Sequence, residues 1–273
     1  MRRAAASAGN QLQETMSGIL FDTSFFLLAA TVMVAGIARG LSGFGTGLIV
    51  VPVAAALYDP VVAVVIVVII DSLPIIPLTL PVLKHVNWRE VLPVTLGLAL
   101  FVPLGIMVLK LGDPHILRWA ISIIILICAV FLWRGWRYHG PRTWPVSTAV
   151  GALSGLLGGI ASIPGPPVIM YWMASAAPAF MIRANLMALF MLGEVFAFAN
   201  QWAAGFLTAE RVWLGAAMAP IYMTGLGTGC LLYGRSAEAT YRRITFSLVV
   251  ASALLAMPPV GRALRSALSG LVA

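Results

Sequence analysis

Charged residues are scarce in this sequence of 273 residues, at 10% of the chain, whereas a soluble domain usually carries about 25%. Hydrophobic residues make up 61%, and the mean hydropathy is +0.99. The apolar residues are spread along nearly the whole chain, so they do not mark a single core or a single anchor. The composition therefore predicts a multi-pass integral membrane protein.

The residue types from which metal sites and catalytic centres are built are also few. The two cysteines, Cys128 and Cys230, lie inside apolar runs and indicate neither a disulfide framework nor a metal site. None of the three histidines is paired at the spacing of metal ligands on a helix. No phosphate-binding Gly-x-x-x-x-Gly-Lys-Ser/Thr loop is present. We therefore expect no metal, no cofactor and no enzymatic activity, with a membrane-embedded enzyme as the competing hypothesis.

The net charge is the one marked imbalance, at +8 with a pI near 10.2. In a soluble protein, this charge would suggest nucleic acid as a partner. In a membrane protein, Arg and Lys instead collect in cytoplasmic loops, and the densest cluster, Arg134, Arg137 and Arg142, separates two apolar blocks. We therefore expect membrane lipid, and no nucleic acid, around this chain.

Apolar blocks bounded by charged residues or by Asp-Pro follow one another along the sequence. They lie near 21 to 40, 46 to 58, 61 to 83, 91 to 110, 116 to 134, 146 to 162, 166 to 177, 184 to 204, 212 to 233 and 243 to 260. A helix needs about 20 apolar residues to cross a bilayer, so blocks 46 to 58 and 166 to 177 are short. We expect an all-α integral membrane fold with about 8 transmembrane segments, in a range of about 7 to 10.

The two halves of the chain repeat. An offset of 112 residues takes Leu41-Ser42-Gly43 to Leu153-Ser154-Gly155, and an offset of 122 takes Gly105 to Gly227. Duplication with broken helices is typical of secondary transporters, although the sequence leaves parallel and inverted repeats open. We expect an N-terminal tail at 1–20, a first transmembrane repeat at 21–136, a basic connecting loop at 137–145, a second repeat at 146–262 and a C-terminal tail at 263–273.

Four glycines lie in the first candidate segment, from Arg39 to Gly47. Each costs about 1 kcal/mol relative to alanine inside a helix, so the helix should break here. A break at membrane depth indicates an internal cavity, and the free N–H groups of the following half-helix suit an anion. The alternatives are that the glycines permit close helix packing and that Arg39 extends to the membrane surface. The candidate anion-binding residues are Arg39, Ser42, Gly43, Phe44, Gly45, Thr46 and Gly47.

A second candidate segment follows in the other half of the chain. Pro164, Pro166 and Pro167 lack an N–H, so a continuous helix is improbable, and a new half-helix should begin near Pro166. Tyr171, about one turn further, either covers one end of the expected anion pocket or packs against neighbouring helices. The candidates in this segment are Ser154, Gly155, Ser162, Gly165, Pro166 and Tyr171.

Two carboxylates lie in the middle of apolar blocks, at Asp71 and Glu194. Carboxylates inside the membrane are costly and can carry coupling protons in transporters. The alternative for Asp71 is an ion pair with Arg39 or Arg183.

Three motifs together are similar to one known family. They are Arg39-Gly-Leu-Ser-Gly-Phe-Gly followed by Val51-Pro52, Gly165-Pro-Pro-Val-Ile-Met-Tyr171, and Arg183-Ala-Asn185-Leu186. This combination resembles the sulfite exporter TauE/SafE family, also called the toluene-sulfonate uptake permease group, over about Phe21 to Leu255. One departure is Pro164, which stands where the family often has the first glycine of Gly-Gly-Pro-Pro.

The resemblance implies a secondary transporter, often an exporter, of sulfite, an organosulfonate or a related small anion. It also implies a bacterial inner-membrane location and adds Arg183 and Asn185 to the candidate site. An anion channel, or an uptake permease for another small carboxylate or sulfur oxyanion, is the alternative, and a homodimer is left open.

Overall fold

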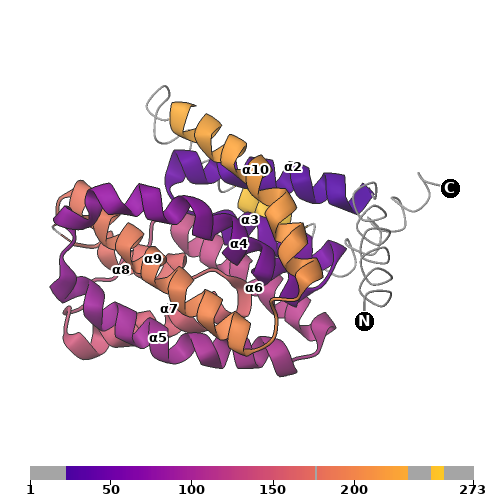
Figure 1. Cartoon of the computed structure of the whole chain (residues 1–273). Coiled ribbons are helices and arrows are strands. Elements are labelled where there is room, and N and C mark those ends of the chain that lie inside the picture. The colour runs from indigo at the N-terminus through magenta and orange to yellow at the C-terminus, as the bar shows by residue number, and fades with distance from the viewer. Residues whose placement is uncertain (1–22, 176, 233–246, 255–273) are drawn as a thin grey trace, which may run out of the picture.

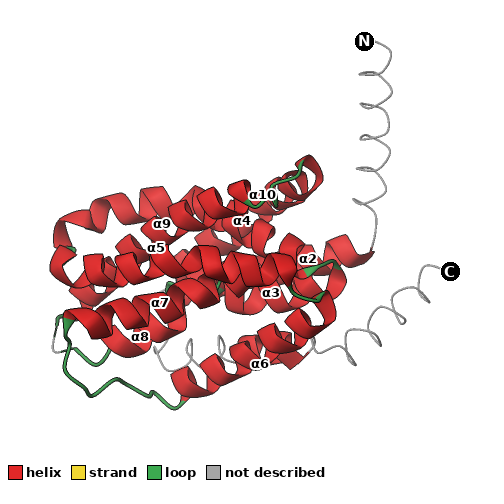
Figure 2. Cartoon of the chain, turned by 90° about the horizontal axis from the view of Figure 1, so that it is seen from below, coloured by secondary structure: helices red, strands yellow, loops and turns green. Residues whose placement is uncertain are grey.

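The structure, a computed structural model, describes residues 23–175, 177–232 and 247–254, and every regular element in these ranges is helical (Figure 2). The expected tails, 1–20 and 263–273, lie outside the described residues. Residues 247–254 are helical as well. The labelled elements are α2 (Thr23–Ser42), α3 (Thr46–Leu57), α4 (Pro60–Thr79), η1 (Leu80–His85), α5 (Trp88–Leu111), α6 (Pro114–Trp133), α7 (Trp144–Ala161), α8 (Gly165–Trp172), α9 (Ala179–Ala203) and α10 (Ala209–Leu232).

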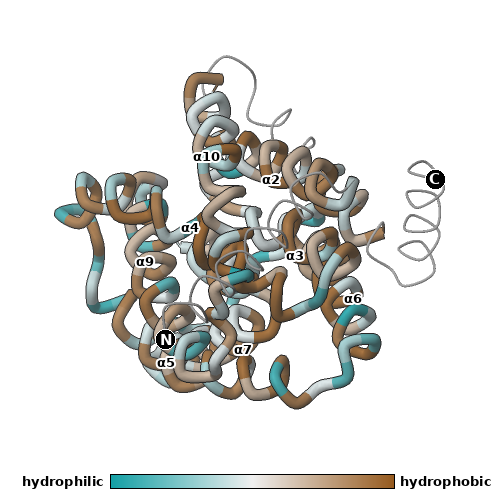
Figure 3. Tube along the Cα trace, turned by 45° about the vertical axis from the view of Figure 1, so that its right-hand side comes forward, coloured by the Kyte–Doolittle hydropathy of each residue, from teal (hydrophilic) through white to brown (hydrophobic). Residues whose placement is uncertain are grey.

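Seven helices in the described part of the chain are long and apolar enough to cross a membrane. They are α2, α4 continued by η1, α5, α6, α7, α9 and α10. Large apolar side chains point outward from them, as at Leu100, which is 63% exposed, and Ile116, which is 66% exposed. Hydrophobic residues run along the helices in Figure 3, and many of the hydrophilic ones lie at loops and helix ends. Lipid is the solvent that suits such outer faces.

α3 and α8 are too short to cross a bilayer. At 1.5 Å per residue they extend for about 18 and about 12 Å, against a hydrocarbon core of about 30 Å. Both lie inside the protein, since every residue of α3 is buried and α8 buries all but Met170. They coincide with the two apolar blocks that the sequence marks as short.

Two glycine-lined helix pairs lie on opposite sides of the bundle, α2 with α10 and α5 with α7, and α3 and α4 lie between them (Figure 1). A Cβ atom on Gly40 would lie 2.5 Å from the carbonyl oxygen of Leu226. One on Gly159 would lie 2.5 Å from the carbonyl oxygen of Val102. Backbones at this distance leave no room for a side chain. Close packing, one of the two roles considered for the glycines, therefore applies to Gly40.

Gly229→Ala is expected to destabilise the protein by about 1–3 kcal/mol, because overpacking forces the backbones apart. Its new Cβ would lie 2.3 Å from the carbonyl oxygen of Ile37. Gly227→Ala, on the same helix, is the matched control, since nothing lies within 4 Å of its Cβ. Thermal unfolding of both variants in detergent, followed by circular dichroism, measures the difference. Equal unfolding temperatures would contradict the close approach of α2 and α10.

Candidate functional site

The first junction, residues 43–45, separates α2 from α3. Gly43 has φ 79° and Gly45 has φ 110°, both in the left-handed region that favours glycine. Ser42 closes the end of α2, since its hydroxyl lies 2.7 Å from the carbonyl oxygen of Ala38 and 2.8 Å from that of Phe44. The glycines thus supply the backbone freedom that the turn requires, and Ser42 fixes its shape.

The second junction, residues 162–164, separates α7 from α8. Ser162 follows the last residue of α7 and has φ 52°. Its N–H donates to the carbonyl oxygen of Gly158 at 2.9 Å, which is a common way to end a helix. The hydroxyl of Ser154, inside α7, donates back to the carbonyl oxygen of Pro164. Ser154 therefore holds this junction in shape.

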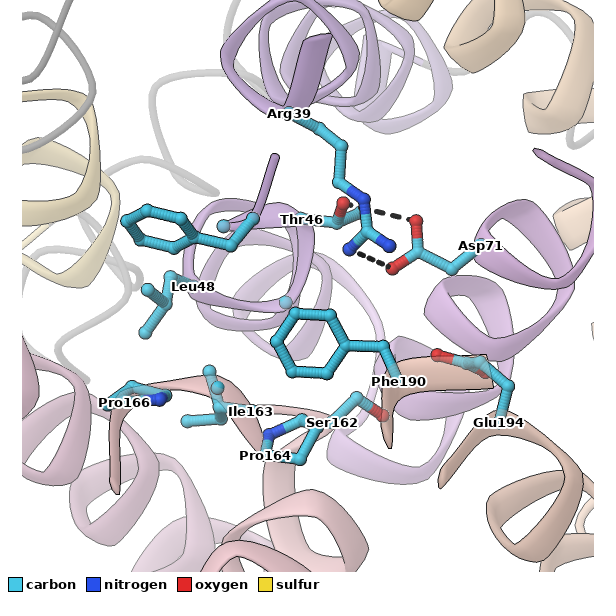
Figure 4. Close-up of a pocket in the computed structure, with 14 residues that line it drawn as sticks. Arg39, Thr46, Leu48, Asp71, Ser162, Ile163, Pro164, Pro166, Phe190 and Glu194 are labelled. Atoms are coloured by element: carbon cyan, nitrogen blue, oxygen red, sulfur yellow. Dashed lines mark hydrogen bonds and ion pairs between the residues drawn. The ribbon is translucent and has the colours of Figure 1, made fainter. Parts of the chain in front are cut away.

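The two junctions meet inside the protein (Figure 4). A Cβ atom on Gly47 would lie 2.1 Å from the carbonyl oxygen of Ser162, so the start of α3 rests directly on the second junction. Beside this contact is a cavity of about 40 Å³, which is room for about three waters. Its lining residues are Arg39, Phe44, Gly45, Thr46, Gly47, Leu48, Asp71, Ser162, Ile163, Pro164, Gly165, Pro166, Phe190 and Glu194.

An ion pair between Arg39 and Asp71 lies at the wall of this cavity. Nη1 of Arg39 is 3.0 Å from Oδ2 of Asp71, and the two side chains are 12% and 5% exposed. The other carboxylate oxygen of Asp71 accepts from the hydroxyls of Tyr222 and of Thr46, the latter at 3.1 Å. Of the two pairings considered for Asp71, the structure forms the one with Arg39.

Several hydrogen-bond donors belong to residues that line the cavity. Nη1 of Arg39 donates to Asp71, and the guanidinium lies over the Phe190 ring, with 6.0 Å between Cζ and the ring centroid. Its remaining N–H groups bond no other side chain among the described residues. The first N–H groups of α3 have no acceptor within that helix, and they carry the positive end of its dipole. The Ser162 hydroxyl is buried and has no hydrogen-bond partner in the described part of the chain. The cavity therefore brings several donors together, which suits a small anion, and the carboxyl groups of Asp71 and Glu194 line it as well.

Some predicted residues support the cavity without lining it. Gly43 lies in the first junction, and Ser42 and Ser154 hold the two junctions in shape through their hydrogen bonds. Gly155 packs α7 on α5, because its Cβ would lie 2.4 Å from the carbonyl oxygen of Leu98. Their roles are thus in backbone shape and helix packing.

The residues of the other motifs in the second half lie away from the cavity. The Tyr171 hydroxyl is 2.7 Å from that of Ser147, so Tyr171 packs, which is one of its two expected roles. Asn185 accepts a hydrogen bond from the N–H of Asn87 at 2.8 Å. Arg183 is exposed on α9. None of these three residues lines the cavity.

Sequence reasoning missed Tyr222 and Phe190. Tyr222 is fully buried in the middle of α10, where a phenol hydroxyl needs a partner. That need was a usable signal, but the sequence does not say that the partner is Asp71. Phe190 has no comparable signal, since one phenylalanine among apolar neighbours is typical of any membrane helix.

The comparisons with known proteins identify a family for this chain. The profile of the family described as Sulfite exporter TauE/SafE matches residues 28–256. A probable sulfite/organosulfonate exporter TauE of Cupriavidus necator is 28% identical over 234 residues, which cover 81% of this chain and 89% of the relative. No solved structure matches the chain. Because the family match covers most of the sequence, the chain belongs to the sulfite exporter TauE/SafE family of membrane transporters.

Proposed function

We propose that this protein is a secondary transporter, working as an exporter in the bacterial inner membrane, for a small anion of the sulfite or organosulfonate class. The observation that carries the proposal is the meeting of two helix junctions at a cavity lined by Arg39. The name of the Cupriavidus necator relative, a probable sulfite/organosulfonate exporter, supports the choice of anion.

The chemistry of the cavity fits a sulfur oxyanion. Such an anion spreads its charge over several oxygens, so it is bound best by several donors that approach from different sides. Arg39, the first amides of α3 and the Ser162 hydroxyl provide this arrangement from different segments. The space, with room for about three waters, suits sulfite or the head of a sulfonate.

We further propose that the junctions are the broken helices of a duplicated unit. An offset of 119 residues takes Gly40 to Gly159 and Gly43 to Ser162. Gly43 and Ser162 each directly follow a helix and have a positive φ. α2 packs on α10, and α7 packs on α5, so the first helix of each half contacts the other half. The offset of 112 is less consistent with the helices, because it pairs the last residue of α2 with Ser154 inside α7. Secondary transporters commonly bind substrate between such repeats.

Flux measurements in proteoliposomes test this function. We expect saturable movement of sulfite and methanesulfonate, with counterflow. We also expect Ser162→Ala to weaken the apparent affinity for these anions by about tenfold, because one hydrogen bond to a charged group is lost. Ser147→Ala is the matched control, since Ser147 bonds Tyr171 outside the cavity. Flux no faster than in empty liposomes would refute transport of these anions, and flux without saturation or counterflow would indicate a channel.

A further inference from the structure

Two carboxylates reach the cavity in very different states of hydrogen bonding. Asp71, from α4, accepts from Arg39, Thr46 and Tyr222, so its oxygens are occupied by donors. Glu194, from α9, also lines the cavity, but its Oε2 atom is buried and has no partner in the ranges that the structure describes. Figure 4 shows the Glu194 carboxyl group on the side of the cavity where Asp71 also lies. Of the two, Glu194 is the one with a buried carboxyl oxygen that has no donor among the described residues.

The charge of the cavity depends on Glu194. Arg39 and Asp71 neutralise each other, so an ionised Glu194 leaves the cavity with a net negative charge, which opposes an incoming anion. An ionised carboxylate also has only acceptors, whereas a protonated one can donate its O–H to an anion. Both effects favour anion binding when Glu194 holds a proton.

Few other ionisable groups surround Glu194. Arg39 and Asp71 share the cavity with it, and Tyr222 bonds Asp71 from α10. Of the other elements that pack on α9, α7 has no ionisable residue and α8 has only Tyr171, which bonds Ser147. The ionisable residues of α5 and η1 lie near the helix ends, at Lys84, His85, Arg89, Glu90 and Lys110. The other ionisable residue of α9 itself is Arg183, near the start of that helix. Among the described residues that line the cavity, Glu194 is therefore the group that we expect to gain or lose a proton, because Asp71 is held ionised by its donors.

We propose that Glu194 is the proton-binding residue of this transporter, and that it takes up one proton when the anion binds. The inference rests on the proposed function and assigns its proton-binding group, with Asp71 as the fixed partner of Arg39. By linkage, a proton that strengthens anion binding is itself bound more tightly once the anion is present, and by the same factor.

Titration of purified protein with methanesulfonate at several pH values tests the proposal. This anion keeps one charge across the range, so any pH dependence belongs to the protein. We expect affinity to fall by about tenfold per pH unit over the alkaline part of the range in the unmodified protein. In Glu194→Gln, whose amide imitates the protonated carboxyl, affinity should stay at the acidic value throughout.

Calorimetry in buffers of different ionisation enthalpy gives a second measurement. In the alkaline range, where affinity falls with pH, it should detect uptake of about one proton per bound anion in the unmodified protein and none in Glu194→Gln. Glu210→Gln, an exposed glutamate at the start of α10, should keep the unmodified behaviour. Flat affinity in the unmodified protein, or a slope retained in Glu194→Gln, would overturn the proton site while leaving anion transport intact. Absence of binding at every pH would instead overturn the proposed function, and this inference with it.

Discussion

Arg39→Ala is expected to weaken binding of sulfite and methanesulfonate by about a hundredfold or more. The change removes the cationic side chain of the cavity and its charge-assisted hydrogen bonds, together worth about 3 kcal/mol or more. It also leaves Asp71 buried without its counter-charge, which costs about 3–5 kcal/mol of stability. Binding titrations and thermal unfolding of the purified variant measure the two effects separately.

A double variant separates the loss of folding from the loss of binding. Combining Arg39→Ala with Asp71→Asn removes both charges, and the new amide can still accept from Tyr222 and Thr46. We expect this variant to recover most of the lost stability without recovering affinity. Arg39→Lys keeps the charge but lacks the planar guanidinium, so its affinity should be intermediate. If the double variant bound methanesulfonate as tightly as the unmodified protein, Arg39 would have no part in the site.

Gly47→Ala is expected to cause the second large loss, of at least about tenfold in anion affinity together with about 1–3 kcal/mol of stability. The added Cβ would lie 2.1 Å from the carbonyl oxygen of Ser162 and 3.0 Å from its carbonyl carbon. Both contacts are with backbone, which cannot rotate away. The junctions would have to separate, and the donors of Arg39, α3 and Ser162 would no longer face one anion.

Gly165→Ala is the matched control at the other junction. Its new Cβ would meet side-chain atoms of Ile169 and Phe190 at 3.5 Å, which is an ordinary contact. We expect an unfolding temperature close to that of the unmodified protein and flux that still saturates. Equal affinity in Gly47→Ala and the unmodified protein would show that the distance between the junctions does not control the site.

The residues that end or begin helices at the two junctions act locally. Glycines at 43 and 45 and prolines at 164, 166 and 167 end or begin helices through their own backbone properties. α2 ends at Ser42 and α8 begins at Gly165, close to where these residues predict. The lengths of the apolar blocks likewise indicated which helices are too short to cross the membrane.

The functions of individual hydroxyls could not be predicted in the same way. Ser42, Ser154 and Ser162 are equivalent by composition, since each is a serine beside glycine-rich sequence. In the structure the first two bond backbone carbonyls at the junctions, and Ser162 has a buried hydroxyl without a partner at the cavity. The difference depends on which way each side chain points at the end of its helix.

The sequence by itself determined that this chain is a helical membrane protein, because hydropathy acts over a few residues, and its glycines and prolines predicted two helix breaks for the same local reason. Only the tertiary structure decided that Arg39 pairs with Asp71 and that Tyr222 also bonds Asp71. It also decided that Oε2 of Glu194 is buried without a donor in the described part of the chain. Tyr222 is 151 residues from Asp71 along the chain, and packing of helices from both halves brings the two together. No periodicity encodes such a contact, since it depends on how closely the glycine-lined helices approach.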